Sequence, residues 1–500
     1  MKKLCLLLAM TLAVGLTGCQ KTEADTKAET KQETSAAVDE TVEDVIAETD
    51  AVKIELSNSE ILVDGEKISE DTESAVYKAN DIIFYLEDQG IEYGEGTEKD
   101  AHSQTEADAH TVVHIAEPGT YEISGTMDAG QIFVDLGDGT KDEEEAVATL
   151  ILNNADITCT VAPAILFYRT YECAGDVEEE DATMDVDTSA AGANLVLADG
   201  SKNKIYGSYV AEIYESCELN EEGTEVIDSK RLHKYDGAVF SRRSLNISGS
   251  GKLEIVAENE GLCSDMHMTI NGGDIRIKSG NDGINTSEDN ISVFTMNDGE
   301  LDIQVTGETG EGDGIDSNGW LLINGGIVNT SACATSGDAG IDADKGIYIN
   351  GGTVVASGNM AAELADGKQH TVSFMSREKL EAGGKYEIKD AEENVVMEVS
   401  PSNAFSMLAV SSELLTDDGK YTLWLDDVQI AEGMSGAMEM PGPGMMPAEG
   451  FKDGERPEPP EGFKGGERPE PAEGFKDGER PESPEEFKND KRLERPGETN

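Results

Sequence analysis

A glycine pattern that returns five times constrains the fold of this 500-residue chain more than any other feature. The first glycine of each repeat recurs at intervals of 24, 22, 31 and 26 residues, and a second glycine at intervals of 22, 26, 27 and 26. Periods of roughly 20 to 50 residues are typical of solenoids, in which each repeat packs on its neighbours. The two sets are Gly237, Gly261, Gly283, Gly314 and Gly340, and Gly251, Gly273, Gly299, Gly326 and Gly352.

The segments between these glycines are short runs bounded by Gly, Asn or Asp. Such runs are typical of strands and turns. Helical periods are nearly absent, and the leucine and asparagine frame of a leucine-rich repeat is missing. We therefore predict an all-β fold: a right-handed parallel β-helix, with coils about 4.8 Å apart, followed by a small C-terminal β segment. The apolar residues expected to form an inward ladder are Ala238, Leu262, Ile284, Ile315 and Ile341.

Aspartates beside these apolar residues predict a metal site. If Ile315 and Ile341 point inward, strand alternation places Asp316 and Asp342 on the outer face, and stacking brings them together. Carboxylates this close repel each other unless a cation lies between them, and calcium takes about six to eight oxygen ligands. The expected calcium ligands are Asp265, Asp282, Asp313, Asp316, Asp338, Asp342 and Asp344.

The alternative is that the aspartates only form turns. Asp-Gly pairs are good turn formers, which alone explains Asp236 and Asp298. Two other calcium-binding patterns are excluded. The segment DADKG lacks the spacing and terminal glutamate of an EF-hand, and the repeats are far longer than those of a nonapeptide β-roll.

The N-terminus has the features of an export signal. Lys2 and Lys3 precede a short apolar run that ends in LTGC at residues 16–19, which resembles the lipobox of bacterial lipoproteins. We expect cleavage before Cys19 and lipidation of its thiol. The protein would then lie on the cell membrane, facing outside the cytoplasm, with this lipid as its only membrane anchor. An ordinary signal peptide with a chance cysteine is the alternative.

Composition limits the partners. With 103 acidic and 38 basic residues, the formal charge is −65, which argues against nucleic acid and favours cations. The cysteines after Cys19 are odd in number and lack CxxC spacing, so we expect mostly buried thiols and no disulfide frame.

Changes in composition divide the chain into five parts. The tail repeats every 12 residues with one phenylalanine per repeat, which cannot form a core, so we expect a disordered segment there. The acidic stretches 92–110 and 176–192 are expected to be loops. The five parts are a signal peptide (1–18), a disordered acidic stalk (19–51), the β-helix domain (52–360), the C-terminal β segment (361–431) and the Pro- and Gly-rich tail (432–500).

Four segments outside the later repeats complete a recognisable pattern: GTYEISGTMDAGQIFVDL, ATLILNNADIT, LVLADGSKNKI and DGAVFSRRSLNISGSGKLEI. With the repeats, they make the chain from about Val52 to Ala431 resemble the clostridial carbohydrate-binding-domain-containing family. These are calcium-binding parallel β-helix proteins related in shape to pectate lyases. The resemblance implies a surface protein that binds plant cell-wall polysaccharide, either cellulose or pectin-like acidic glycans, with calcium in the β-helix. The acidic stretches and a shortened repeat at NEGLCSD depart from the family pattern.

A carbohydrate-binding module is therefore favoured over two alternatives, a pectate-lyase-like enzyme and a surface adhesin or wall scaffold. No catalytic residue is assigned, because a lyase needs a base beside its metal. Trp320, next to the aspartates, is the candidate for stacking on a sugar, and packing at a coil end is the alternative. The basic residues considered, none of them in register with the aspartates, are Arg242, Arg243, Arg276 and Lys278.

Overall fold

The computed structural model describes residues 51–435, apart from residues 366, 417 and 418. The expected signal peptide, Cys19, nearly all of the expected stalk and the 12-residue repeats lie outside the described residues. Among the described residues, no helix is long and apolar enough to cross a membrane.

Strands dominate the described residues, which confirms the prediction of a nearly all-β chain. Two short helical elements occur among them: α1 (Gln104–Asp108) and the 3-10 helix η2 (Thr140–Asp142). The helix α1 lies in an acidic stretch expected to be a loop, so that prediction is wrong at these residues. The reason is a capping box, in which Ser103 Oγ accepts from Glu106 N at 3.2 Å and Glu106 Oε2 accepts from Ser103 N at 2.8 Å.

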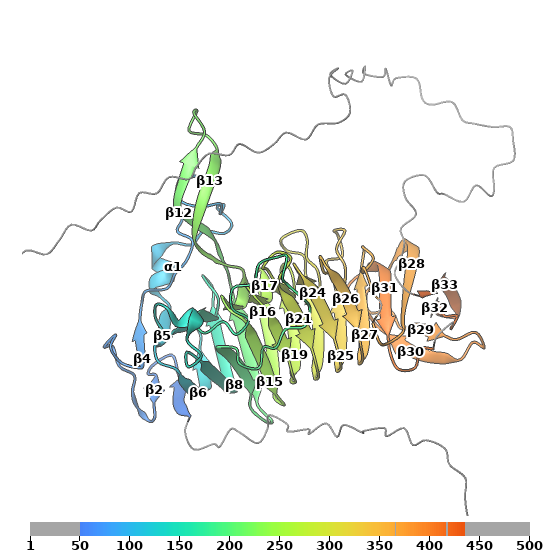
Figure 1. Ribbon diagram of the computed structural model, residues 1–500, viewed down its shortest axis with the longest axis horizontal. Coiled ribbons are helices and arrows are strands. Elements are labelled where there is room, and N and C mark those ends of the chain that lie inside the picture. The colour runs from blue at the N-terminus through green and yellow to red at the C-terminus, as the bar shows by residue number, and fades with distance from the viewer. Residues whose placement is uncertain (1–50, 366, 417–418, 436–500) are drawn as a thin grey trace, which may run out of the picture. The chain divides into compact units, whose positions relative to one another are not determined.

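Successive coils stack their strands in parallel, as Figure 1 shows. In the first ladder, Asn194 pairs with Thr149 of the preceding coil and Asn246 of the next. The two-residue strands β2 (Leu62–Val63) and β3 (Glu66–Lys67) add an antiparallel edge beside β1. The strands of this ladder are β1 (Val52–Leu56), β6 (Gly119–Met127), β8 (Ala148–Cys159), β10 (Ala193–Leu197), β15 (Leu245–Gly249), β18 (Met268–Ile270), β21 (Val293–Met296), β24 (Trp320–Ile323) and β26 (Gly346–Ile349).

A second parallel ladder continues from the far half of β8, which pairs with β11. It ends where β31 (Phe405–Ser411) pairs antiparallel with the last coil and with β28 (Thr371–Leu380), which in turn pairs with β34 (Met434–Ser435). The strands of the second ladder are β11 (Lys202–Gly207), β16 (Lys252–Ala257), β19 (Asp274–Ser279), β22 (Glu300–Val305), β25 (Ile327–Ser331) and β27 (Thr353–Gly358).

The remaining strand of each coil joins a separate eight-stranded sheet. Its pairs are parallel except for the first, between β4 and β5. In order, its strands are β4 (Val76–Ala79), β5 (Thr111–Ile115), β7 (Gly130–Asp135), β9 (Ile165–Arg169), β14 (Gly237–Ser241), β17 (Glu260–Ser264), β20 (Ile284–Thr286) and β23 (Ile315–Ser317).

The core lies inside the coils and is built from alternate strand residues. Leu262, Ile284 and Ile315 pair along the eight-stranded sheet and are 0% exposed. The first repeat differs from the expected ladder, because Val239 and not Ala238 pairs with Leu262. Both residues are fully buried, but the first repeat is offset by one residue from its glycine.

The turns at the second glycine tie the coils together. Asn324 Nδ2 donates to Asn297 Oδ1 at 2.9 Å, and the same bond repeats at 2.8 Å from Asn297 to Asn271 and at 2.9 Å from Asn350 to Asn324. The second glycine of the repeat, two residues after this asparagine, has a positive φ, 78° at Gly326, which disfavours a side chain. A short amide ladder therefore runs along this edge.

Two additions depart from the coil pattern. The hairpin β12 (Val210–Leu219) and β13 (Val226–Tyr235) is antiparallel. After the last coil comes a four-stranded antiparallel sheet with its own hydrophobic cluster, which includes Tyr386 and Leu423. Its strands are β30 (Val395–Val399), β29 (Tyr386–Lys389), β32 (Thr422–Leu425) and β33 (Val428–Glu432). The five cysteines of the described residues are free.

Candidate metal centre

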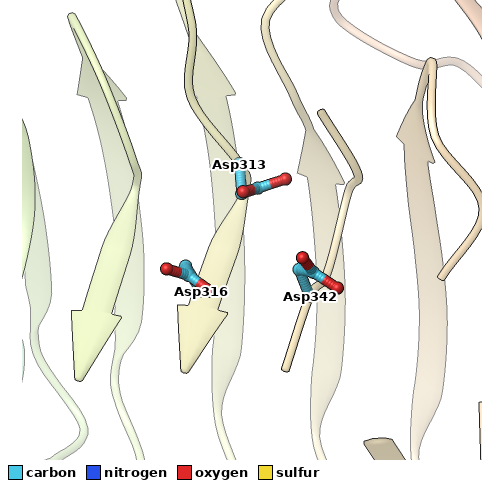
Figure 2. A group of neighbouring side chains, drawn as sticks. All are labelled: Asp313, Asp316 and Asp342. Atoms are coloured by element: carbon cyan, nitrogen blue, oxygen red, sulfur yellow. The ribbon is translucent and has the colours of Figure 1, made fainter. Parts of the chain in front are cut away.

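Three carboxylates meet at β23. One oxygen from each of Asp313, Asp316 and Asp342 lies within 4.8 Å of the other two. Figure 2 shows Asp313 just before the strand, Asp316 within it and Asp342 on the neighbouring segment. The structure therefore brings together three of the seven residues expected to bind calcium.

Strand register explains this proximity. Ile315 pairs with Ile284 on one side and forms a bridge with Ile341 on the other, and all three are fully buried. Because side chains alternate along a strand, the next residues, Asp316 and Asp342, face outward on adjacent coils.

Burial and mutual repulsion raise the pKa values of these carboxyl groups. Desolvation is the largest cause for Asp316, whose pKa is raised to about 7, and the charges of Asp342 and Asp344 add to it. Desolvation, followed by the charge of Asp282, raises the pKa of Asp313 to about 8. Burial also raises the pKa of Asp342. Ionising all three groups therefore requires a compensating positive charge, which a bound cation supplies.

Asp282 and Asp338 lie beside the three carboxylates and are held by backbone N–H groups. Asp282 Oδ1 accepts from Asp313 N at 2.7 Å. Asp338 Oδ2 accepts from Gly312 N at 2.6 Å and from Ser336 Oγ. These bonds orient both side chains, and the other oxygen of each makes no hydrogen bond within the described residues.

The two remaining expected ligands lie apart from this group. Asp265 pairs with Arg242, whose Nε is 3.7 Å from Asp265 Oδ2. Asp344 is exposed and acts on the group through its charge, which raises the pKa values of Asp316 and Asp342. Asp265 thus has a cationic partner already, unlike the members of the central group.

The donor set decides which metal fits. All the groups that meet here present carboxylate oxygen, and neither histidine nor cysteine belongs to the described group. Zinc favours nitrogen and sulfur ligands, whereas calcium is a hard cation that takes about six to eight oxygens in flexible geometry. The donor set therefore fits calcium, which Asp313, Asp316 and Asp342 would hold.

Comparison with known proteins places the chain in a family. The family model described as carbohydrate-binding domain-containing protein matches residues 109–412, more than half of the chain. The chain belongs to this family. A carbohydrate-binding domain-containing protein of Acetivibrio thermocellus is 29% identical over 168 residues, which make up 33% of this chain and 45% of the relative. The match therefore spans less than half the length of that relative.

A solved structure is also similar to part of this family member. It is the polysaccharide lyase-like protein from C. thermocellum, as a gadolinium derivative, and the likeness covers 61% of this chain and 90% of that chain. The identity is 22% and the TM-score is 0.36. A likeness at this level carries no argument about the site.

A further buried acidic residue, Glu260, begins β17 on the coil that also carries Asp265. Glu260 is 5% exposed, and its Oε2 is buried without a hydrogen-bond partner among the described residues. The Oδ1 of Asn285 is likewise buried and unpartnered, while Asn285 Nδ2 donates to Glu260 Oε1 at 3.1 Å. Burial, followed by the charge of Asp236, raises the pKa of Glu260 to about 8. Together with Asp282, these two residues are candidate ligands for a second cation.

A sequence signal for Glu260 exists. An acidic residue directly precedes the first glycine in four of the five repeats: Asp236, Glu260, Asp282 and Asp313. Turn formation alone explains Asp236 in the sequence, and Glu260 is not among the expected ligands. Buried acids stacked on one edge are costly without compensation, so the recurrence indicates more than turn formation.

Trp320 lies on a different sheet from the carboxylates. It begins β24 of the first ladder, where it pairs with Val293 and Gly346, and its side chain is half-buried. Its backbone oxygen accepts from Ser317 Oγ at 3.0 Å, which closes the turn after β23. The indole is thus adjacent in sequence to the metal centre but projects from another face.

Proposed function

We propose that this protein binds polysaccharide outside the cytoplasm and that calcium held between its coils takes part in the binding. The observation that carries the proposal is the group formed by Asp313, Asp316 and Asp342, whose half-buried carboxylates lie within 4.8 Å of one another. Family membership supports the carbohydrate-binding role, and the oxygen-only donor set supports calcium.

Calcium would let a strongly acidic protein hold an acidic glycan. The formal charge of −65 opposes the approach of a polyuronate. A divalent cation on the outer face of the sheet neutralises most of the charge of the three carboxylates, and it can share coordination positions with uronate oxygens. We therefore propose pectin-like plant cell-wall glycans as ligands of this centre.

Isothermal titration calorimetry of the full chain with polygalacturonate tests this function. We expect binding in calcium, loss of binding in EDTA, and loss of binding in calcium for Asp316→Asn/Asp342→Asn. The matched control, Asp199→Asn/Asp298→Asn, removes the same two charges from exposed Asp-Gly turns and should bind like the wild type. If both double variants bind equally well, the aspartate group is not the glycan-binding centre.

The same samples distinguish the alternative functions. A pectate-lyase-like enzyme would generate the absorbance of unsaturated uronides during the titration. A surface adhesin or wall scaffold would give no glycan signal under any condition. We propose the binding module because Arg242, a candidate base for a lyase, is paired with Asp265.

We also propose that the stacked coils form a right-handed parallel β-helix. Parallel pairing between strands of successive coils supports this architecture. Parallel strands joined by a crossover within one sheet are right-handed in nearly all known cases. An experimental structure with left-handed coils would refute this assignment.

Finally, we propose that Cys19 is lipidated and anchors the protein to the cell membrane. The proposal is supported by LTGC at residues 16–19 after a basic and apolar leader. Replacing Cys19 with alanine should release the protein into the medium and abolish labelling by a radioactive fatty acid. Unchanged membrane retention without labelling would contradict it.

A further inference from the structure

A polar cleft lies between the second ladder and the C-terminal sheet, away from the aspartate group. Its cavity volume is about 230 Å³. One wall is the outer face of β22, β25 and β27, and the other is the end of β30 with the turn after it. The side chains that matter for its chemistry are Asp302, Asn329, Val355, Glu398, Val399 and Pro401.

Strand register aims Asp302 and Asn329 at this cleft. The two residues pair with each other, and Asn329 also pairs with Val355 on the next coil. The neighbours of Asp302 in the strand, Leu301 and Ile303, are 0% and 1% exposed and point into the core. Alternation therefore places Asp302, Asn329 and Val355 in one outward column along the cleft wall.

The opposite wall is fixed by hydrogen bonds that begin two residues further along the same strands, at Gln304 and Ser331. Gln304 Nε2 donates to Ser402 O at 3.3 Å and to Asn403 Oδ1 at 3.1 Å. Ser402 N donates to Ser331 Oγ at 2.9 Å, and Asn403 Nδ2 donates to Ala332 O at 2.8 Å. The turn that closes the cleft is therefore held in place independently of any ligand.

By contrast, the side chains of Asp302 and Asn329 are unused. No hydrogen bond or ion pair formed by the described residues involves either side chain. Burial raises the pKa of Asp302, against the charge of Arg276 on the preceding coil. A carboxylate and an amide thus present free hydrogen-bonding groups to a preformed cavity.

The lining selects the chemistry of the ligand. It contains no cationic and no aromatic side chain, but combines acceptors at Asp302 and Asn329 with apolar surface at Val355 and Pro401. Glu398 also lines the cleft, and its Oε1 pairs with Lys385 at 2.8 Å. Sugar hydroxyls can donate to such acceptors while the C–H face of the ring packs on the apolar side. A uronate carboxylate would meet two carboxylates instead. The volume is below the roughly 300 Å³ at which typical ligand pockets begin, which suits one sugar ring.

We propose that this cleft is a second, calcium-independent subsite that seats one neutral sugar unit of a glycan through Asp302 and Asn329. The proposal rests on the carbohydrate-binding role but not on the calcium centre. It divides recognition between an acidic-glycan centre on the eight-stranded sheet and a neutral-sugar subsite on the second ladder.

The test is calorimetric titration of the full chain with cellotetraose in EDTA. We expect binding by the wild type and at least about tenfold weaker binding by Asp302→Ala/Asn329→Ala, because two hydrogen bonds, one to a charged group, are removed. Asp302→Asn keeps hydrogen-bonding capacity and should stay within about threefold. Glu254→Ala, on the same outward column two coils away, should leave the affinity unchanged.

Several results would overturn the proposal. They are absence of cellotetraose binding by the wild type, equal affinity of the double alanine variant, and equally strong binding of tetragalacturonate in EDTA. Ser400 lies on the exposed rim of the cleft. Ser400→Trp should fill the cleft and block binding, so this variant tests the proposal if the double alanine variant fails to fold. Calcium-dependent polygalacturonate binding is measured separately on Asp316→Asn/Asp342→Asn. That variant should retain cellotetraose binding, so the two proposals fail independently.

Discussion

One column of outward positions on the eight-stranded sheet has two halves of opposite chemistry. Its N-terminal half is aromatic or apolar, and its C-terminal half is amide or acidic. Register shows that this is a single column, because each member pairs with the next from β4 to β23. In order, its members are Tyr77, His114, Phe133, Leu166, Phe240, Cys263, Asn285 and Asp316, with Asp342 following on the next coil.

In the aromatic half, the buried side chains pack on one another, so their burial is favourable. The rings of Tyr77 and His114 stack with centroids 4.5 Å apart, and Phe133 follows at 5.1 Å from His114. Further along, Tyr235 at the end of the hairpin packs on Phe240 at 5.3 Å. These contacts remove apolar surface from water and are favourable in any buffer.

In the acidic half, Asp313 Oδ1 accepts a hydrogen bond from Ala339 N at 2.6 Å, which compensates its burial only in part. No ion pair among the described residues involves Asp313, Asp316 or Asp342, although burial raises the pKa of each. We therefore propose that the same backbone frame carries one half whose stability does not depend on a cation and one half whose stability does. Experiments that separate calcium-dependent from calcium-independent stability test this difference directly.

The largest effect is expected in the aromatic half. Phe240→Ala removes a ring that is 1% exposed and should lower the free energy of unfolding by about 3–5 kcal/mol. Urea unfolding should give the same loss in calcium and in EDTA. Ile327→Ala, at a residue 45% exposed, is the control and should cost no more than about 0.5 kcal/mol. A cost for Phe240→Ala that depends on calcium would show that the stabilities of the two halves are not separate.

An effect comparable in size to that of Phe240→Ala, accumulated over several pH units, is expected from pH in the metal-free protein. The pKa of an aspartate is near 3.8 before folding, and folding raises it to about 7 for Asp316 and about 8 for Asp313. A raised folded-state pKa gives stability that is fully present below the unfolded pKa and is lost as pH rises through the folded pKa. Between about pH 4 and 8, each such aspartate should therefore lower the free energy of unfolding by up to about 1.4 kcal/mol per pH unit.

The measurement is the difference in unfolding free energy between the wild type and Asp316→Asn/Asp342→Asn, followed across this pH range in EDTA. The variant should gain on the wild type as pH rises. Saturating calcium should reverse that trend, since metal binding requires the ionised carboxylates. A pH-independent difference in EDTA would show that the carboxylates are hydrated and not repelling one another.

The smallest effect is expected at the amide ladder, which belongs to neither half. Asn324→Ala removes two exposed hydrogen bonds, to Asn297 and from Asn350, and should cost about 1 kcal/mol. Thermal melts should show the same decrease with and without calcium. A loss as large as that of Phe240→Ala would mean that these turns control coil stacking.

The repeat made the coils predictable, because inward positions such as Ile284 and Ile315 follow from glycine spacing and strand alternation. The same logic predicts that Asp316 and Asp342 lie together. Glycine spacing gave the wrong residue where a coil departs from the common repeat: Val239, and not Ala238, pairs with Leu262. It also passed over Glu260, because one acidic residue before a glycine looks like a turn former until its burial is known.

Contacts between distant segments could not be predicted from local pattern. Four successive strand pairings connect Tyr77 to Phe240 in the aromatic half. No periodicity in the sequence indicates this column. The proposed neutral-sugar cleft depends on Gln304 meeting Ser402, 98 residues later. The hairpin that supplies Tyr235 directly precedes the first glycine repeat, and its sequence gives no signal of where it packs.

The central claim is that the acidic half binds calcium through its three clustered aspartates. Calorimetric titration of the metal-free full chain with calcium tests it most directly, with Asp316→Asn/Asp342→Asn and the control Asp199→Asn/Asp298→Asn titrated in parallel. Loss of outer ligand contacts alone typically weakens metal binding by about 10–100-fold, so loss of two ligand charges should weaken it by at least about 100-fold. The account predicts that loss for the first variant and wild-type affinity for the control. Unchanged calcium affinity and stoichiometry in Asp316→Asn/Asp342→Asn would contradict it and leave these aspartates as turn formers.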